Sequence, residues 1–380
     1  MLSEFIDPIY TAIVVFPILA LVFTLPYLFY QYRRYGSVVI FRAVVVYSFI
    51  LYLLCAYFLV ILPLPSFEEA ASGTGSLWQL TPLECVRNVL NMEGFSPRDL
   101  STYRLLLYND DFQHAVLNFI MFIPLGIYLH YYFRRGFFIT LLIGFALTCF
   151  FEFTQISALY GIYPRPYRFF DVDDIIFNTL GAVAGFIISP LFTWIFPKRE
   201  RLDEISYNRG RRLSPFRRLL AALADCLLIA LVILLLSGIF KGMEIGEFSP
   251  GNILLYIVVV GLYFIGFSVV WRGFTPGKRL LRMQVVSENG NMPSLKAYAI
   301  RYGILYYIWL PSLYVAVKLN EISYEVHYSW AVTILVGIFA LIFFVFLFQA
   351  LTTLFKDDRI MLHERISHTR TSNLIKPEIE

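Results

Sequence analysis

The sequence predicts an all-α fold, a polytopic bundle of about nine transmembrane helices with the N-terminus outside the membrane and the C-terminus inside. Composition is the first observation behind this prediction: 58% of the 380 residues are hydrophobic and only 15% are charged, as in integral membrane proteins. The second is that apolar residues are grouped in runs of the roughly 17 to 25 residues that cross a hydrocarbon core. The third is an uneven distribution of cations along the chain.

Nine apolar runs are long enough to span a membrane: 8–31, 38–62, 112–133, 137–160, 172–196, 216–240, 252–271, 297–317 and 329–355. If the N-terminus lies outside, the segments that follow inside hold 24 of the 31 Lys and Arg residues. Because cytoplasmic loops are rich in basic residues, this count favours an N-outside, C-inside topology. The first residues, MLSEFID, are acidic and lead into a long apolar run, so we expect a retained first span.

Charge and cysteine usage narrow the class of protein further. The 31 basic residues face 27 acidic ones, a formal net charge of +4, which is too balanced to indicate a nucleic-acid partner. The four cysteines form no Cys-x-x-Cys pair, so neither a zinc cluster nor a disulfide framework is expected. The most basic segment divides five apolar runs from four. We therefore predict one membrane domain at 1–200, a basic cytoplasmic linker at 201–215 and a second membrane domain at 216–380.

The segment 63–111, predicted to lie outside, is too long for a simple connector. Thr81-Pro82-Leu83-Glu84 and Ser96-Pro97-Arg98-Asp99 each combine a capping residue, a proline at the first helical position and an acidic residue three positions after the cap. We therefore expect a short extracellular pair of amphipathic helices whose apolar sides lie in the membrane interface. A lid on the bundle and a surface presented to lipid or wall material fit this pattern equally well.

Polar side chains gather at one predicted depth, in the outer half of the third, fourth and fifth apolar runs and the loop before the fifth. The set is His114, Asn118, Glu152, Gln155, Arg165, Arg168, Asp171, Asp174 and Asn178. Spacings of three, four and seven residues place members of each helix on one face. Because polar residues inside a membrane are costly and often functional, we predict an outward-opening polar pocket. Gly181 and Gly185 continue the last stripe with a spacing that lets a neighbouring helix approach closely.

The residue types of this predicted pocket suit several kinds of chemistry. Arginines recognise phosphate or carboxylate through paired hydrogen bonds, whereas a histidine with carboxylates could ligate a cation or transfer protons. No His-Glu-x-x-His or nucleophile motif occurs, so the metal, the cofactor and any catalytic role stay unknown. In the structural alternative, Glu152 pairs with Arg165 or Arg168 to lock helices, and His114 caps its own span. We favour a ligand site.

These residues carry a resemblance to a known family. The stretches NFIMFIPLGIYL (118–129), FEFTQ (151–155) and YRFFDVDDIIFNTLGAVAGF (167–186) resemble the ordered motifs of the VanZ-like family, and the resemblance covers about residues 10 to 196. It implies a multi-pass protein of the bacterial plasma membrane, in a family named for low-level resistance to teicoplanin, a lipid-bearing glycopeptide antibiotic. It implies no settled mechanism.

The second half of the chain has three polar motifs outside or near its apolar runs. Arg218 and Asp225 open the sixth run, where we expect Asp225 to pair with an arginine. Thr275-Pro276-Gly277-Lys278 precedes the strand-like MQVV and an Asn289-Gly290 turn, which together predict a hairpin. RIMLHERISHTRT follows the last run. We expect a polar cluster on the inner face with the members Arg218, Asp225, Arg301 and Glu364.

These three motifs resemble the RDD family over about residues 212 to 373. Glu364 follows His363 where that family usually has an aspartate. The resemblance implies a membrane module that has been linked, in a few members, to ion or proton exchange. Structural ion pairing and transport are equally compatible with the inner cluster.

Three functional hypotheses follow, and we favour the first. The protein binds membrane lipids and a lipid-linked cell-wall precursor or lipoglycopeptide in the outer pocket, and thereby contributes to glycopeptide tolerance. Alternatively, it is an enzyme that uses Glu152, His114 and Asp174 with a divalent cation on a lipid-linked phosphate. A third possibility is an ion or lipid transporter whose path joins the outer and inner clusters.

Overall fold

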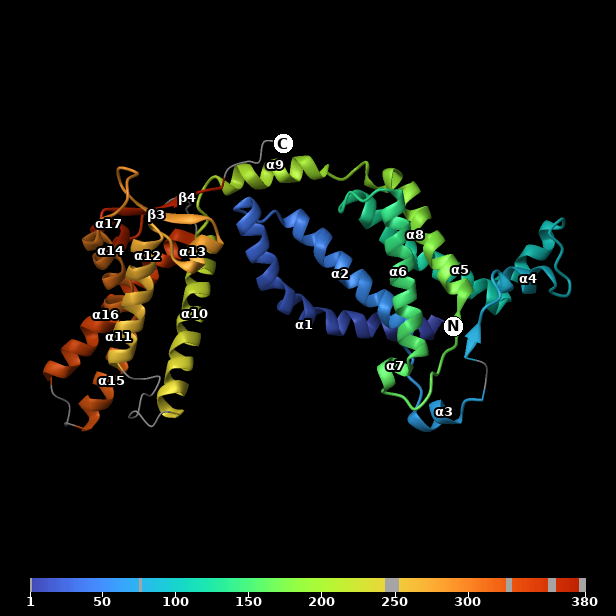
Figure 1. Ribbon diagram of the computed structural model, residues 1–380, viewed down its shortest axis with the longest axis horizontal. Helices are drawn as coiled ribbons and strands as arrows, with labels where there is room; N and C mark the ends of the chain where they lie inside the picture. Colours follow the sequence, from blue (N-terminus) through green and yellow to red (C-terminus); the bar gives the residue numbers. More distant parts are fainter. Residues whose placement is uncertain (1, 75–76, 243–252, 326–329, 355–359, 376–380) are drawn as a thin grey trace. The chain divides into compact units, whose positions relative to one another are not determined.

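The computed structural model describes residues 2–74, 77–242, 253–325, 330–354 and 360–375 (Figure 1). Helices dominate and the few strands are short, so the predicted all-α membrane fold is confirmed. The chain forms two compact units. The first comprises Met1–Thr24 and Ile40–Leu202, and the second comprises Leu25–Val39 and Asp203–Glu380. Helix α1 (Leu2–Tyr35) contributes residues to both units.

Eight of the described helices are long and apolar enough to cross a membrane: Asp7–Tyr35, Ile40–Ile61, Asp110–Tyr131, Phe137–Ile156, Val172–Thr193, Pro215–Ile239, Leu295–Glu321 and Trp330–Thr352. They coincide with eight of the nine predicted runs, and the chain is a multi-pass membrane protein. The run at 252–271 forms a shorter apolar helix, Leu255–Val270, within the described residues. The ninth crossing therefore stays a prediction, as does the N-outside, C-inside orientation that requires an odd number of spans.

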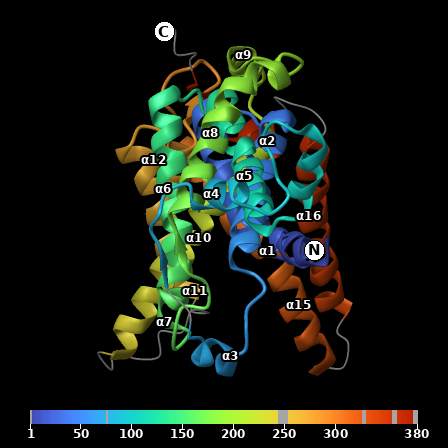
Figure 2. The same ribbon diagram turned by 90° about the vertical axis from the view of Figure 1, so that its right-hand side faces the viewer.

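Four long helices build the body of the first unit: α2 (Ile40–Ile61), α5 (Asp110–Tyr131), α6 (Phe137–Ile156) and α8 (Val172–Thr193). Helix α8 packs against both α5 and α6 (Figure 2). Polar side chains set the starts of two of them, since Asn109 Oδ1 accepts from the Phe112 amide and Asp171 Oδ1 accepts from the Asp173 amide, each at 2.8 Å. The hydrophobic core of this unit contains Ala56, Phe122, Leu125, Leu129, Phe151 and Ala182.

Glycines let α5 and α8 approach until their backbones touch. A Cβ atom at Gly181 would lie 2.1 Å from the Phe119 carbonyl oxygen, and one at Gly185 would lie 2.0 Å from the Ile123 carbonyl oxygen. Both distances are far inside van der Waals contact, so any side chain would force the helices apart. The close approach predicted from the Gly181 and Gly185 spacing is confirmed.

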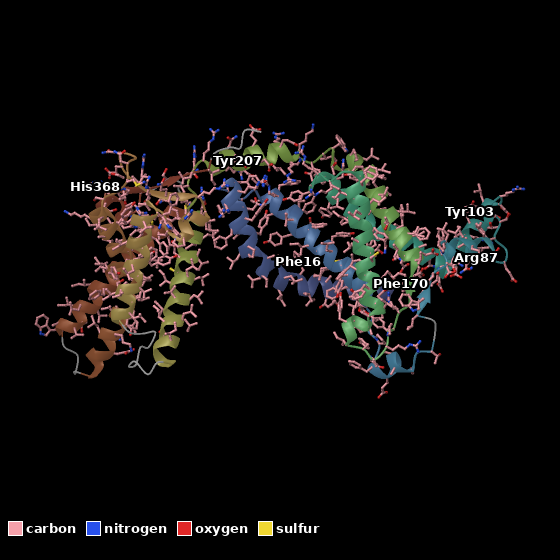
Figure 3. The ribbon with its side chains drawn as sticks, in the orientation of Figure 1. Phe16, Arg87, Tyr103, Phe170, Tyr207 and His368 are labelled. Carbon is pink, nitrogen blue, oxygen red and sulfur yellow. The ribbon has the colours of Figure 1, made fainter. Side chains whose placement is uncertain are left out.

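The segment between α2 and α5 contains four short elements: α3 (Phe67–Ser72), β1 (Trp78–Gln79), α4 (Glu84–Leu90) and the 3-10 helix η1 (Leu100–Tyr108). Strand β1 pairs in parallel with β2 (Phe170–Asp171), which contains the Phe170 labelled in Figure 3. The Trp78 and Phe170 rings lie 5.4 Å apart. The two predicted helical segments are present. Helix α3 was not predicted, although Ser66 and Glu69 form the capping box that could have revealed it.

Both predicted helix caps in this segment are wrong. Helix α4 begins after Leu83, which has a φ of 58° and provides no side-chain cap. The Thr81 amide, which would donate to Glu84 in a capping box, donates to Gln79 Oε1 at 2.5 Å. Helix η1 begins after Asp99, whose carboxylate accepts from the Ser101 amide at 2.9 Å. The backbone of Ser96 is held by the Thr102 hydroxyl, so the chain starts its helix three residues later than predicted.

The second unit consists of helices and one two-stranded sheet. Helix α9 (Arg199–Gly210) begins in the first unit and continues into the second. The elements that follow it are α10 (Pro215–Gly242), α11 (Ile253–Gly261), the π-helical η2 (Leu262–Gly266), α12 (Phe267–Val270), α13 (Pro276–Leu280), β3 (Met283–Ser287), α14 (Leu295–Tyr302), the π-helical η3 (Gly303–Trp309), α15 (Leu310–Glu325), α16 (Trp330–Leu354), α17 (Leu362–Ile366) and β4 (Thr369–Asn373). Its core contains a stack of aromatic rings in which Phe264 and Tyr306 lie 3.8 Å apart.

The predicted hairpin after the Thr275 turn is wrong in its second strand. The strand-like MQVV forms β3, and Gly290 is in a turn with a φ of +81°. The partner of β3, however, is β4 from the C-terminal segment, paired antiparallel with Met283 opposite Asn373. The C-terminal segment is held in this place because its alternate residues Thr369 and Thr371 are buried. Thr369 Oγ1 accepts from Arg301, and Thr371 Oγ1 donates to Glu364.

Candidate functional site

Of the nine polar residues predicted for the outer pocket, three are buried and three more, on α5 and at the start of α8, are partly buried. Their hydrogen bonds join α5, α6 and α8. Glu152 is 2% exposed and its Oε2 accepts from the Asp171 amide at 3.0 Å. Asn118 Nδ2 donates to Asp174 Oδ1 at 2.5 Å. The structure thus brings Asn118, Glu152, Asp171 and Asp174 to one end of the three helices, where the chain enters α8.

Two further members of the predicted set extend this buried polar layer to its neighbours. Gln155 Nε2 donates to the Val60 carbonyl oxygen at 2.9 Å, which joins α6 to α2. Asn178 Nδ2 donates to Thr148 Oγ1 at 2.9 Å, which joins α8 to α6. Each bond satisfies a polar group that would be costly to leave unpaired in an apolar environment.

The two arginines lie elsewhere, in a cleft of about 610 Å³ at the same end of the first unit. We call it the arginine cleft; its lining is Pro63, Leu64, Pro65, Glu69, Ala70, Gly73, Leu77, Arg165, Pro166, Tyr167, Arg168 and Phe169. Arg168 donates to the Leu62 carbonyl oxygen at 3.1 Å, and the Tyr167 hydroxyl donates to the Ile61 carbonyl oxygen at 2.9 Å. Burial raises the pKa of Tyr167 to about 12, so this hydroxyl keeps its proton.

The arginine cleft lies at the level where the chain leaves and re-enters the apolar layer. Its walls follow directly after Ile61, the last residue of α2, and come just before Val172, the first residue of α8. Its acidic residue, Glu69, is engaged by Ser66, whose amide donates to the carboxylate at 2.8 Å. That hydrogen bond and one from the Ser66 side chain lower the pKa of Glu69. The lining of the cleft thus has two guanidiniums and one carboxylate, which Ser66 already engages.

His114 does not join the other predicted residues. It lies on α5 one turn before Asn118, but it is exposed and forms no hydrogen bond or ion pair in the described part of the chain. The enzyme hypothesis required His114, Glu152 and Asp174 together on a cation. Among the described residues, no group of three or more His, Cys, Asp or Glu side chains is arranged to hold a metal ion.

Three of the four residues predicted for the inner cluster meet in the second unit. Glu364 is 2% exposed and forms ion pairs with Arg301 at 3.0 Å and with Arg218 at 3.2 Å. Thr371 Oγ1 also donates to Glu364 Oε1 at 2.8 Å. Because Arg301 in turn donates to Thr369 Oγ1 at 2.8 Å, this network fastens α17 and β4 to α10 and α14.

Asp225 has a different site, and the expectation that it pairs with an arginine is wrong. It is fully buried and accepts three hydrogen bonds, from the Tyr263 hydroxyl at 2.8 Å and from the Thr275 hydroxyl and the Gly277 amide at 2.6 Å each. Gly277 allows this approach, since a Cβ there would lie 2.2 Å from the Ala221 carbonyl oxygen. Neutral donors already satisfy the carboxylate, which leaves no geometric need for a guanidinium.

Comparison with known protein families agrees with this division of polar sites. Residues 49–193, which contain the buried layer and the arginine cleft, match the VanZ/LLP1 family, and residues 212–368, which contain Asp225 and Glu364, match the RDD family. The chain joins a VanZ/LLP1 domain to an RDD domain. The two resemblances read from the sequence are confirmed.

A search of curated proteins found a relative named Uncharacterized protein YckC from Bacillus subtilis (strain 168). It is 31% identical over 94 residues, which are 24% of this chain and 59% of YckC. The chain therefore covers less than two thirds of this relative. No solved structure matches the chain.

Asp173 of the VanZ/LLP1 domain is a structural residue that the sequence analysis did not select. It is buried, and its two carboxylate oxygens accept from the Leu83 amide at 2.5 Å and the Cys85 amide at 2.9 Å. It therefore caps α4 from about 90 positions away along the chain. The sequence shows Asp173 beside Asp171 and Asp174, but it gives no sign that Asp173 accepts hydrogen bonds from the start of α4.

We expect Asp173→Asn to make the Cys85 thiol more reactive. Burial and, next, the negative charge of Asp173 raise the pKa of Cys85 to about 12, so the thiol is almost wholly protonated at pH 8 and reacts slowly. Removing the charge lowers that pKa, and the loss of one cap bond loosens α4. The rate of Cys85 alkylation, measured by peptide mass spectrometry, should rise several-fold, whereas the exposed control Asp110→Asn should leave it unchanged. An unchanged rate in Asp173→Asn would contradict this assignment.

Arg217 is the corresponding unselected residue of the RDD domain. It is fully buried, and its guanidinium donates to the Leu281 carbonyl at 2.5 Å and 2.9 Å, to the Arg282 carbonyl at 2.9 Å and to Asn373 Oδ1 at 2.9 Å. All of these partners are neutral oxygens. It holds the end of α13 and strand β4 beside α10. The sequence placed Arg217 next to Arg218 but could not distinguish their roles.

We expect the RDD domain to lose stability on acidification, starting below about pH 6.5. Burial and the nearby Arg301 lower the pKa of His363 from 6.5 to about 3. Between pH 6.5 and pH 3, the unfolded chain therefore binds a proton at this residue that the folded domain does not bind. Stability therefore falls as pH falls through this window, by on the order of 1 kcal/mol per pH unit. Hydrogen exchange of the β3 and β4 amides at pH 7 and pH 5 measures this loss.

The variant His363→Gln should flatten this pH dependence between pH 6.5 and 5, because its side chain does not titrate. The matched control is His368→Gln, because His368 is exposed at the surface of this domain (Figure 3). Its Nδ1 atom lies 3.2 Å from Glu288 Oε1. An equal pH dependence in wild type and His363→Gln would show that His363 is not the group responsible.

Proposed function

We propose that the VanZ/LLP1 domain binds a lipid-linked ligand bearing a phosphate or carboxylate in the arginine cleft, at the outer face of the bacterial plasma membrane. By holding a lipid-linked cell-wall precursor or a lipoglycopeptide, it contributes to tolerance of glycopeptide antibiotics such as teicoplanin. The observation that carries the proposal is the pair Arg165 and Arg168, which line a cleft of about 610 Å³ where the helices leave the apolar layer.

The chemistry of the cleft suits an anionic headgroup attached to an apolar tail. Guanidiniums bind phosphate and carboxylate oxygens with paired, charge-assisted hydrogen bonds. The remaining walls are largely apolar, and the exposed ring of Phe169 is part of them. Aromatic residues at this depth are typical of the membrane interface, where a lipid-linked molecule presents its polar group.

The buried polar layer gives the cleft its rigidity. Glu152 holds the Asp171 amide, and β2 pairs with β1, so the end of the loop that carries Arg168 is fixed to α6 and to the segment before α4. In this proposal Glu152 is a positioning residue and the arginines contact the ligand. A site held by a rigid scaffold loses less entropy when it binds.

The test is the minimum inhibitory concentration of teicoplanin, with vancomycin as the antibiotic control, in a susceptible Gram-positive host that expresses the protein. Wild type should raise the teicoplanin value selectively, and Arg165→Gln/Arg168→Gln at matched membrane levels should abolish the rise. The matched control Arg98→Gln/Arg104→Gln removes two exposed cations outside the cleft and should retain the wild-type value. No rise with wild type, or a rise that survives loss of the cleft arginines, would contradict the proposal.

A further inference from the structure

A second cleft, of about 710 Å³, lies at the opposite end of the VanZ/LLP1 domain from the arginine cleft. Its lining comes from the last turns of α5 and α8, the start of α6 and the chain that leads into α9: His130, Tyr131, Arg134, Arg135, Gly136, Phe186, Pro190, Thr193, Trp194, Phe196, Lys198, Arg199 and Glu200. Figures 1 and 2 show that α3 and α7 (Ala158–Gly161) lie at one end of α6 and the beginning of α9 at the other. We call this second site the basic cleft.

The basic cleft has more positive charge than its own carboxylate can neutralise. Four of its residues are Lys or Arg, and one, Glu200, is acidic. Glu200 pairs with Arg134. Arg135 and Lys198 are exposed and have no carboxylate partner in the described part of the chain. The Arg135 guanidinium and the Lys198 ammonium are therefore available to bind an external anion.

Two further donors in the cleft are already oriented by the protein. Arg199 donates to the Tyr132 carbonyl oxygen at 2.9 Å and lies 5.8 Å from the centre of the Tyr132 ring. The His130 ring packs edge-on against Phe186, and its Nδ1 atom is buried with no hydrogen-bond partner within the described residues. An anion with several oxygens would satisfy groups that the protein alone leaves unsatisfied.

The other walls of the basic cleft indicate that its anion carries an apolar tail. Phe186, Pro190 and Trp194 line the cleft on the α8 side. The outer face of α8 continues from there with Ile187 and Leu191, which are 64% and 72% exposed. In a helix that crosses a membrane, this face contacts acyl chains, so a molecule with its headgroup in the cleft can lay its chains along α8.

We propose that the basic cleft binds the headgroup of an anionic phospholipid, with the phosphate held by Arg135, Lys198 and Arg199. Basic pockets between the ends of membrane helices are a known way to hold anionic headgroups. The distribution of cations predicts that this end of the domain faces the cytoplasm. The inference concerns a site separate from the arginine cleft, and it does not depend on the function proposed for that cleft.

Native mass spectrometry of the purified full-length protein, titrated with phosphatidylglycerol or phosphatidylcholine, tests this inference. Wild type should bind phosphatidylglycerol in preference to phosphatidylcholine. In Arg135→Gln/Lys198→Gln the affinity for phosphatidylglycerol should fall by about 30-fold, the loss expected for two cations near a membrane phosphate. The matched control Arg201→Gln/Arg211→Gln removes the same charge from exposed positions outside the cleft and should bind like wild type.

Inorganic phosphate distinguishes a lipid site from a site for a small anion. If the site is a lipid site, millimolar phosphate should compete weakly with phosphatidylglycerol, since it cannot use the apolar face of α8. Full displacement by phosphate, or equal binding of the two lipids, would overturn the inference. Equal losses in the cleft variant and its control would also overturn it, because the effect would then be one of net charge alone.

Discussion

Replacing Glu364 by glutamine should destabilise the RDD domain by about 3 to 5 kcal/mol, the usual result of removing one partner from a buried ion pair. Glu364 is the carboxylate partner of Arg301, whose side chain is 4% exposed, and of the partly exposed Arg218. Without the Glu364 carboxylate, the Arg301 guanidinium stays buried but loses the negative charge that compensates it. The loss is large because a desolvated guanidinium is harder to accommodate than a neutral side chain.

The charge state of Glu364 supports this expectation. Burial by itself raises the pKa of a carboxyl group, but the guanidiniums of Arg301 and Arg218 outweigh it and hold the pKa of Glu364 well below its usual range. The carboxylate is therefore ionised at neutral pH. Its contribution to stability is present above pH 4.5 and decreases as pH falls from there toward the lowered value.

Hydrogen exchange of the β3 and β4 amides measures the effect of Glu364→Gln within the RDD domain. The double variant Arg301→Gln/Glu364→Gln should lose less stability than the sum of the two single variants, because the uncompensated charge is removed. Glu288→Gln is the matched control: it breaks an exposed contact with His368, and its effect should stay below about 1 kcal/mol. Equal, small effects of Glu364→Gln and Glu288→Gln would contradict the role assigned to Glu364.

Adding one methyl group at Gly181 should destabilise the VanZ/LLP1 domain by about 3 kcal/mol or more, at or above the upper end of the usual penalty for overpacking. The new Cβ would lie 2.1 Å from the Phe119 carbonyl oxygen, and a backbone oxygen cannot move away as a side chain can. Helices α5 and α8 must separate, which strains the hydrogen bond between Asn118 and Asp174 about two turns away along α8.

The yield of monodisperse protein and its apparent melting temperature in detergent measure the effect of Gly181→Ala. The control is Gly136→Ala, also in the VanZ/LLP1 domain, because a Cβ at Gly136 would meet nothing within 4 Å. Gly136→Ala should behave like wild type. If Gly181→Ala also behaved like wild type, α5 and α8 would not be in backbone contact.

Much of the fold is predictable because membrane insertion depends on local properties of the chain. Length and hydropathy of each run set the positions of eight spanning helices, and a four-residue spacing of glycines indicated the close approach of α8 to α5. The ordered motifs identified both families. The same periodicity placed Asn118, Glu152 and Asp174 at one depth, where the structure also has them, although their role as a ligand site stays a proposal.

The sequence by itself determined the positions of eight helices that are long and apolar enough to cross a membrane, and which polar residues share a depth. It could do so because transfer from water to lipid is a property of each residue and its spacing. Only the tertiary structure decided the partners. Asp173 caps α4, Asp225 accepts from Tyr263, Thr275 and Gly277, and the tail supplies the strand beside β3. Hydrogen bonds act over about 3 Å, so their choice depends on which distant segments packing brings together, and that information is absent from any local pattern.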